Sequence, residues 1–368
     1  MSRFELGMSV DYASSWGVAD AVREFFQNAI DEQKENPENK MSFSYDEEKQ
    51  ILSIGNLKSK LTPKTLLLGC SSKRGKKELI GTHGEGYKVA TVVLVRNGVQ
   101  VNIYNNEAKE LWQSKIINSR RYGAEVVCFD IEKKFFNRKE NLCVELVGIT
   151  PEMYSSIVES NLHLQDDLGE VVETKHGRIL NNERYSGNIY VEGLFVCHNE
   201  LIDSGYDFNA DMIALDRDRG LVDTFDVKMA IATLYVSIGD SKYIAENIKK
   251  RDLDYVATKL KNAKTFYGKT ELADKVSDAV YINFKNEYGE DAIPVSDTDN
   301  YNMYAESGLN PVMVSNNINE IIRVVNRNFY EDVVIKDLDE EFENWISRNK
   351  FLLKDDEVDK LRFLWSKK

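Results

Sequence analysis

Near its start, the chain has apolar residues that recur at helical spacing. Between Val18 and Glu32 they are Val18, Val22, Phe25, Phe26 and Ala29. A helix turns by about 100° per residue, so these side chains share one face. The polar run ENPENK follows, with Pro37 inside it, and predicts the end of the helix. The pattern therefore predicts a long amphipathic helix with one face in a core.

Short segments rich in β-branched and aromatic residues, bounded by polar turns, predict strands. MSFSYD and QILSIGN flank an acidic turn, and LTPKTLLLG then predicts a short helix. A glycine-rich turn, IGTHGEGYK, opens a further helix, YKVATVVLVRNG. Four more strands are predicted, and a helix PEMYSSIVESNL closes the series; the strands are VQVNIYN, LWQSKII, AEVVCFDIE and NLCVELVGI. We therefore expect an α+β fold with an antiparallel sheet.

The pattern changes after residue 168. GRILNN and GNIYVEGLFV contain glycine turns that predict a hairpin in a small β-rich region. Beyond Asp226 the spacing is mainly helical, with YGEDAIPVSD and LNPVMVSNN as a small α/β element and charged helices at the end. We predict three regions: an α/β domain at 1–168, a second region at 169–264 that starts with the β-rich residues 169–224, and a mixed, mainly helical region at 265–368.

The composition of the chain disfavours several classes of protein. The net charge of −13 disfavours broad binding to DNA or anionic lipid, although SSKRGKKE, residues 71–78, is a local basic patch that leaves nucleic acid open. The four cysteines form no CxxC pair, which argues against a disulfide framework and a zinc cluster. The first residues are polar and mixed, and no apolar run is long enough to span a bilayer. We expect a cytoplasmic protein without membrane contact.

Three polar residues lie opposite the apolar face of the first helix. Glu24, Asn28 and Asp31 fall within a narrow arc. A carboxylate can take a proton from a water that attacks phosphate, and an amide oxygen one turn later can help to hold Mg²⁺. A carboxylate base and an amide ligand for Mg²⁺ on one helix face suit the transfer of a phosphoryl group to water. The alternative is a surface helix whose polar side faces solvent.

The glycine-rich turn is a candidate phosphate site. Gly81, Gly84 and Gly86 precede a helix, where bare backbone amides bind anions, and Lys88 adds a positive charge. A purely structural turn is the alternative. Upstream, CSSKRGKKEL carries hydroxyl groups and four cations, as expected for a segment that closes over a polyphosphate. A solvated basic loop is the alternative there.

The order of these motifs resembles the GHKL ATPase superfamily of gyrase, heat-shock chaperones, histidine kinases and MutL. Glu24-x3-Asn28-x2-Asp31 is followed by an LxIxN strand end, then LGCSSK, then IGTHGEGYK, over about residues 15 to 150. SSK before a G-x-x-G-x-G-x-K turn is most similar to the MORC and MutL branches. The resemblance implies a Bergerat-type ATP-binding α/β sandwich, with a mixed, mostly antiparallel sheet and helices on one face, followed by a transducer-like region.

The resemblance also implies roles for individual residues. Glu24 matches the general base, Asn28 the magnesium ligand and Asp31 a polar residue beside the nucleotide. The nucleotide-binding set it implies is Asn28, Asp31, Asn56, Ser71, Ser72, Lys73, Gly81, Gly84, Glu85, Gly86, Tyr87 and Lys88. The family has Asp-x-Gly-x-Gly where this chain has Asn56 followed by LKSK. An Asn carbonyl can still accept a hydrogen bond from the adenine amino group.

The function implied is an ATP- and Mg²⁺-dependent conformational switch, a slow ATPase that couples nucleotide to homodimerisation or to binding of a protein partner. In such a switch, Arg217 or Arg219 could reach the terminal phosphate from the second region; a salt-bridged turn with Asp216 and Asp218 is the alternative. The alternative function is a GHKL-fold protein that binds nucleotide only structurally, or not at all. It would act by sequestering a partner such as a host defence or replication protein.

Overall fold

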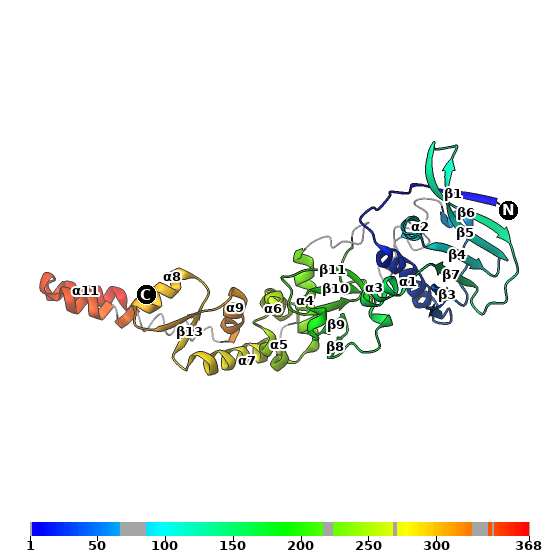
Figure 1. Cartoon of the computed structure of the whole chain (residues 1–368). Coiled ribbons are helices and arrows are strands. Elements are labelled where there is room, and N and C mark those ends of the chain that lie inside the picture. The colour runs from blue at the N-terminus through cyan, green and yellow to red at the C-terminus, as the bar shows by residue number, and fades with distance from the viewer. Residues whose placement is uncertain are drawn as a thin grey trace. The chain divides into compact units, whose positions relative to one another are not determined.

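The computed structural model describes residues 2–66, 86–215, 224–267, 271–325, 338–340 and 342–367 (Figure 1). Two compact units make up the chain, Met1–Val227 and Lys228–Lys368. Both sheets of five or more strands belong to the first unit. The boundaries predicted after residues 168 and 264 stay predictions.

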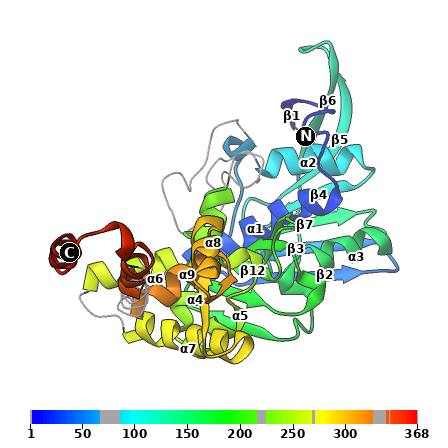
Figure 2. The same ribbon diagram turned by 90° about the vertical axis from the view of Figure 1, so that its left-hand side faces the viewer.

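A seven-stranded sheet forms the centre of the first unit, in the order β1-β6-β5-β4-β7-β3-β2. Its strands are β1 (Ser2–Ser9), β2 (Met41–Asp46), β3 (Ile51–Asn56), β4 (Gln100–Asn105), β5 (Glu110–Ser119), β6 (Ala124–Lys133) and β7 (Leu142–Val147). Every neighbouring pair is antiparallel, so this sheet is not mixed. Figure 2 shows the long β5–β6 hairpin beside β1. The predicted α+β class with a large antiparallel sheet is confirmed.

Strand β1 was not predicted from the sequence. It pairs with β6 at the edge of the sheet, and its register shifts between Glu5 and Ser9. Gly7 lies in this irregular stretch at φ +64°, a conformation that favours glycine. Leu6 and Met8 are buried, so an alternation typical of strands was present in SRFELGMS but was short and interrupted by charges.

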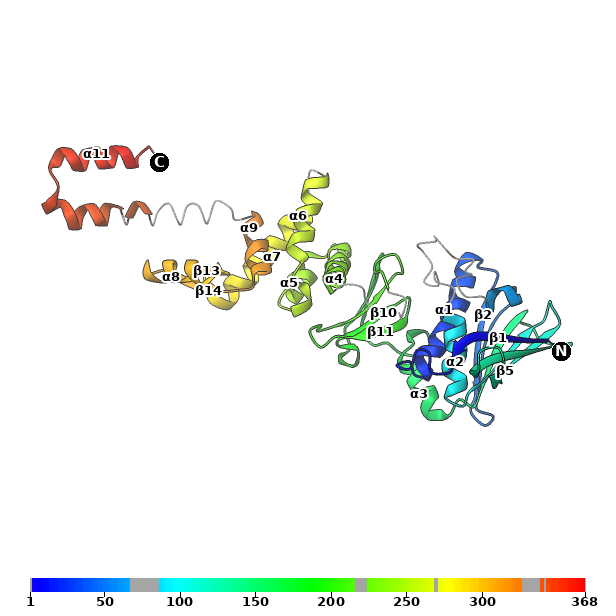
Figure 3. The same ribbon diagram turned by 90° about the horizontal axis from the view of Figure 1, so that it is seen from above.

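Three helices pack on this sheet: α1 (Val18–Glu35), α2 (Gly86–Arg96) and α3 (Pro151–Glu159). Figure 3 shows α1 and α2 on the same face of the sheet. The predicted apolar face of α1 enters the core, where Phe25 and Phe26 are buried. All three helices were predicted, and α1 runs on to Glu35. Of the short helix predicted in LTPKTLLLG, the described part is η1 (Pro63–Leu66).

The second sheet of the first unit has the order β11-β10-β12-β9-β8. Its strands are β8 (Val171–Thr174), β9 (Gly177–Leu180), β10 (Asn188–Val191), β11 (Leu194–His198) and β12 (Gly205–Phe208). The short helix η2 (Leu162–Leu164) precedes β8, and η3 (Glu183–Tyr185) lies between β9 and β10. The predicted hairpin in GNIYVEGLFV is β10–β11. Contacts that join this sheet to α1 include a hydrogen bond from Arg23 Nη1 to the Phe195 carbonyl at 3.0 Å and the ion pair of Lys34 with Glu192 at 2.5 Å.

The second unit is mainly helical, as predicted. Its helices are α4 (Thr224–Ile238, which begins in the first unit), α5 (Ser241–Asn247), η4 (Arg251–Leu253), α6 (Val256–Tyr267), α7 (Glu271–Tyr288), α8 (Thr298–Glu306), α9 (Asn316–Val325), η5 (Lys350–Leu352) and α11 (Asp355–Trp365). Strands β13 (Ala292–Val295) and β14 (Asn310–Met313) pair in parallel around α8, which is the expected small α/β element. Within the described parts of the chain, no helix is long and apolar enough to cross a membrane.

Candidate functional site

The polar side of α1 is buried in the protein. Glu24 and Asp31 are fully inaccessible to solvent, and Asn28 is partly buried. This burial contradicts the alternative of a polar face open to solvent for the two carboxylates. Because a buried carboxylate is costly unless its surroundings stabilise it, the contacts of Glu24 decide what this face can do.

The carboxylate of Glu24 lies against the first residue of α2. A Cβ atom added to Gly86 would stand 1.9 Å from Oε2 and 2.9 Å from Cδ of Glu24. Only glycine therefore leaves room for the carboxylate in this position. The amino end of a helix carries partial positive charge, which favours a carboxylate and equally a phosphate. The contact brings together two residues predicted from separate motifs.

Arg23 is a neighbour of this carboxylate that the motifs in the sequence do not include. Its Nε lies 3.9 Å from Oε1 of Glu24, while its Nη1 donates to the carbonyl of Phe195 in β11. The guanidinium is largely buried and also lies over the ring of Trp16, 5.6 Å from its centroid. Arg23 therefore links the candidate base to the second sheet. In the sequence, the feature that could have indicated Arg23 is its position next to Glu24 on the same helix.

Asn28 presents its amide oxygen as an acceptor. Its Nδ2 donates to the backbone carbonyl of Glu24 at 2.7 Å, which fixes the plane of the amide. No described residue donates to its Oδ1. An amide oxygen suits Mg²⁺, and water or phosphate oxygens would complete the octahedron. In the described residues no group of three or more His, Cys, Asp or Glu side chains is placed to hold a metal.

Asn56 ties the end of β3 to α1. Its Nδ2 donates to the carbonyl oxygens of Ala29, at 3.0 Å, and Asn39, at 3.3 Å. Both partners are acceptors, so this position requires the amide nitrogen. The side chain is almost fully buried. A carboxylate here would face two carbonyl oxygens, which gives a structural reason for Asn where the family has Asp. The Oδ1 atom is the one left for a ligand, so its contact with adenine stays a prediction.

Further polar side chains hold the loops beside Asn56. Asn39 Nδ2 donates to Ser59 Oγ at 2.8 Å, and Ser59 Oγ donates to Glu32 Oε2 at 3.1 Å. The amide of Lys58 donates to Asn39 Oδ1 at 2.6 Å. Asn39 and Ser59 are both buried. A satisfied buried network of this kind specifies one loop conformation, and no pattern along the chain indicates it.

The side chains in the first turn of α2 are largely buried, including that of Lys88. Lys88 is fully inaccessible, which contradicts its solvated alternative. The Tyr87 ring lies edge-on to Phe25, with centroids 4.7 Å apart, and its buried hydroxyl has no hydrogen-bond partner among the described residues. Burial, with a smaller effect of Cys143, raises the pKa of the Tyr87 hydroxyl well above its usual value. This hydroxyl is therefore a neutral potential donor.

Several predicted residues lie outside the described part of the chain. They are Ser71, Ser72 and Lys73 of the basic segment, Gly81, Gly84 and Glu85 of the glycine turn, and Arg217 and Arg219. The structure therefore brings together Glu24 and Gly86, places Asn28 and Asp31 on the same helix, and locates Asn56, Tyr87 and Lys88.

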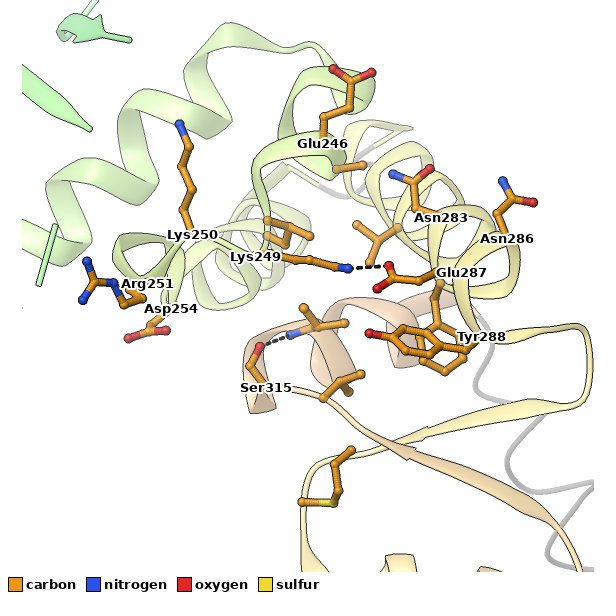
Figure 4. Close-up of a pocket in the computed structure, with 17 residues that line it drawn as sticks. Glu246, Lys249, Lys250, Arg251, Asp254, Asn283, Asn286, Glu287, Tyr288 and Ser315 are labelled. Atoms are coloured by element: carbon orange, nitrogen blue, oxygen red, sulfur yellow. Dashed lines mark hydrogen bonds and ion pairs between the residues drawn. The ribbon is translucent and has the colours of Figure 1, made fainter. Parts of the chain in front are cut away.

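A cavity of about 780 Å³ lies in the second unit (Figure 4). It is lined by α5, the segment after it, α7 and the turn from β14 into α9. The ion pair between Lys249 and Glu287 crosses it, and Phe284 and Ile318 form part of its apolar lining. None of the predicted nucleotide residues lines this cavity.

Comparison with models of known protein families gives no match, and comparison with curated proteins gives none either.

Proposed function

We propose that the first unit binds ATP with Mg²⁺ beside α1 and the amino end of α2, and hydrolyses it slowly. The observation that carries this proposal is the Glu24 carboxylate packed against the Gly86 backbone. It joins a candidate general base to a helix amino end suited to phosphate. Asn28, one turn along α1, adds an amide oxygen that suits Mg²⁺.

The fold supports the same proposal. The sheet is wholly antiparallel where the GHKL resemblance implies a mixed, mostly antiparallel one, and α1, α2 and α3 pack on it as layered helices of that arrangement would. We therefore propose a Bergerat-type fold for this part of the chain. Folds host many functions, so the weight rests on the site residues rather than on the sheet.

In this proposal the chain's own groups act by position and charge. Glu24 accepts a proton from the attacking water, and Asn28 would help to hold Mg²⁺, which would supply positive charge for the phosphate oxygens. The buried Lys88 side chain belongs to the first turn of the same helix. Phosphoryl transfer depends mainly on such positioning and electrostatics, and a general base contributes about 10²–10⁴-fold.

The proposed switch couples nucleotide to the second sheet. Arg23 contacts both Glu24 and the Phe195 carbonyl, so a displacement of the Glu24 carboxylate reaches β11 directly. Lys34 and Glu192 form a second link. Nucleotide-dependent homodimerisation or capture of a protein partner would be the output of this coupling.

Asn56 favours a second candidate function. Its Nδ2 is used in holding α1 and the loop after it to β3, and no glycines follow Asn56, so the chain departs from the family where adenine is read. A protein with this fold could bind nucleotide only structurally, or not at all, and act by sequestering a partner protein.

Calorimetry with ATP and Mg²⁺, together with steady-state turnover, separates the two. We expect Glu24→Gln to keep ATP binding and to lower turnover about 10²–10⁴-fold, and Asn28→Ala to weaken the Mg²⁺ dependence of binding. Glu35→Gln, at the exposed end of the same helix, is the matched control and should leave both unchanged. Turnover undiminished in Glu24→Gln contradicts the ATPase; absence of ATP binding by the wild-type chain favours the second function.

A further inference from the structure

Two asparagines lie at the ends of the strands on either side of β7. Asn56 is the last residue of β3, and Asn105 is the last residue of β4. Both are opposite Leu142 of β7 in the antiparallel register, so the three residues form one row across the sheet. Val101 and Ile103 of β4 belong to the core under α1 and α2, and the alternation of a strand puts Asn105 on this same face.

This row lies at the end of the sheet where the nucleotide is proposed to bind. β4 packs against α2 and follows it after a tight turn, in which the amide of Val99 donates to the carbonyl of Leu94. The 11 residues of α2 span about 16 Å and the 6 residues of β4 about 20 Å, so β4 runs back to the amino end of α2. On the other side of the row, Asn56 bonds to the carbonyl of Ala29, the residue after Asn28.

The hydrogen bonds of the two amides fix which atom of each is left for a ligand. Asn105 Nδ2 donates to the carbonyl of Leu61 at 2.6 Å, and Asn56 Nδ2 donates to the carbonyls of Ala29 and Asn39. A carbonyl oxygen can only accept, so the nitrogen is engaged in both side chains. The remaining group of each amide is therefore its oxygen, which is an acceptor.

The oxygen of Asn105 is buried without a partner. The residue is fully inaccessible to solvent, and its Oδ1 has no hydrogen-bond partner among the described residues. A buried acceptor that lacks a donor costs about 1–3 kcal/mol, and such groups are rare in native proteins. No described residue donates to Asn56 Oδ1 either. The row thus offers two acceptors to a ligand that brings donors.

An exocyclic amine is a group that satisfies two acceptors at once. Two hydrogen bonds of about 2.9 Å from one amino nitrogen place their acceptors roughly 5 Å apart. Strands lie about 4.8 Å apart, so the Cα atoms of Asn56 and Asn105 are separated by about 10 Å, and two inward-leaning side chains narrow this gap. Leu142 between them supplies an apolar surface for a planar ring.

We infer that Asn105 accepts a hydrogen bond from the amino group of the adenine base, as the second acceptor beside Asn56. The inference rests on the ATP site proposed above and adds to it a residue outside the sequence motifs. It makes Asn105 a determinant of base specificity. Guanine in the same orientation carries a carbonyl oxygen where adenine has its amine, and that oxygen would face two acceptors without a proton between them.

Calorimetry of the full chain with Mg²⁺ and two triphosphates tests this contact. ATP and purine riboside triphosphate differ only in the amino group of the base. We expect the wild-type chain to bind ATP about 10²-fold more tightly, and Asn105→Leu to reduce this preference to about tenfold, because one of two hydrogen bonds is lost.

Asn102→Leu is the matched control. The Oδ1 of Asn102 is also buried without a partner among the described residues, but alternation puts this side chain on the opposite face of β4. The control should keep the wild-type preference for ATP. A purely structural role of Asn105 would weaken both triphosphates equally, so an unchanged preference in Asn105→Leu overturns the inference, as does an equal change in Asn102→Leu.

A measurement on the wild-type chain alone makes the test independent of how the variants fold. An ATP analogue with one methyl group on the base amine keeps a single hydrogen, so it leaves one acceptor unpaired and should bind about tenfold more weakly than ATP. Equal binding of this analogue overturns the inference. If ATP and purine riboside triphosphate bind equally, the ATP site stands and the role of Asn105 is wrong; if neither binds, the proposed function fails with it.

Discussion

The carboxylate of Glu24 occupies the space that a Cβ atom of residue 86 would need, since that atom would lie 1.9 Å from Oε2. The two residues come from motifs more than sixty positions apart, and the contact therefore depends on how α1 packs against α2. Because of this contact, the Glu24 carboxylate can lie where it does only if residue 86 is glycine. This gives the proposed site a test that does not alter Glu24 itself.

Gly86→Ala should move the carboxylate with little loss of stability. The clashing atoms are at the end of a flexible side chain, so Glu24 can turn aside, and the free energy of unfolding should fall by no more than about 1 kcal/mol. A displaced base should lower turnover by about 10²-fold. Gly17→Ala is a control, because its Cβ would meet only an ordinary contact with Asp20 at 3.8 Å. Normal turnover in Gly86→Ala would show that Glu24 need not hold this position.

Asn56→Asp should destabilise the first unit although it restores the residue type of the family. The new carboxylate would face the carbonyl oxygens of Ala29 and Asn39 without a proton to donate, at a cost of about 3 kcal/mol. Urea titration measures this loss. In Asn36→Asp, where the amide oxygen accepts from the Glu38 backbone, a carboxylate keeps the contact and should be nearly neutral. Equal stability of the two variants would contradict the structural role of Asn56.

The elements of the first unit that follow strong local patterns were predictable. The apolar spacing of α1 and the six strands from Met41 to Val147 have clear periodicity, because burial on one face imposes it. Strand β1 lacked such a pattern, since it is an edge strand interrupted at Gly7 and supplies few buried side chains. Its pairing with β6 is a long-range contact that no local signal reports.

The candidate site was predictable in composition but not in its contacts. Spacing placed Glu24, Asn28 and Asp31 on one arc, yet it could not show that the arc is buried or that Gly86 meets Glu24. Arg23 was missed because its partner, the Phe195 carbonyl, is a backbone atom distant in sequence. Backbone partners leave no trace in side-chain patterns.

The pairing of β1 with β6 should depend on pH through Asp130. Hydrogen bonds from Arg3, at 2.8 Å, and then Lys115 lower the pKa of this nearly buried carboxyl despite the opposing effect of burial. A lowered folded-state pKa gives stability that is present above the unfolded value of about 3.9 and is lost as pH falls through the folded value.

Asp130→Asn should therefore cost about 1–2 kcal/mol at neutral pH and progressively less below about pH 4. The free energy of unfolding of both proteins, measured across this range, gives the difference directly. Asp11→Asn serves as a control because the Asp11 side chain has no ion pair in the described chain. A difference between wild type and Asp130→Asn that stays constant with pH would argue against the ionised pair.

The two links between α1 and the second sheet should differ in strength because they differ in burial. Arg23 is largely buried and donates to a backbone carbonyl, whereas the Lys34 side chain is 38% exposed in its pair with Glu192. Arg23→Met should cost about 1.5–3 kcal/mol, since it leaves the Phe195 carbonyl without this charged donor. Lys34→Met should cost about 0.2–1 kcal/mol, as exposed pairs do.

Amide hydrogen exchange shows where in the protein the loss of each link acts, and how large its effect is there. Exchange of residues 194–198, the strand β11, should rise in Arg23→Met and change little in Lys34→Met. If Arg23 also transmits the state of Glu24, ATP and Mg²⁺ should alter exchange in β11 of the wild-type chain but not of Arg23→Met. An undiminished response of β11 to nucleotide in Arg23→Met would assign the coupling to another contact, because this variant removes the contacts of Arg23 with both Glu24 and the strand.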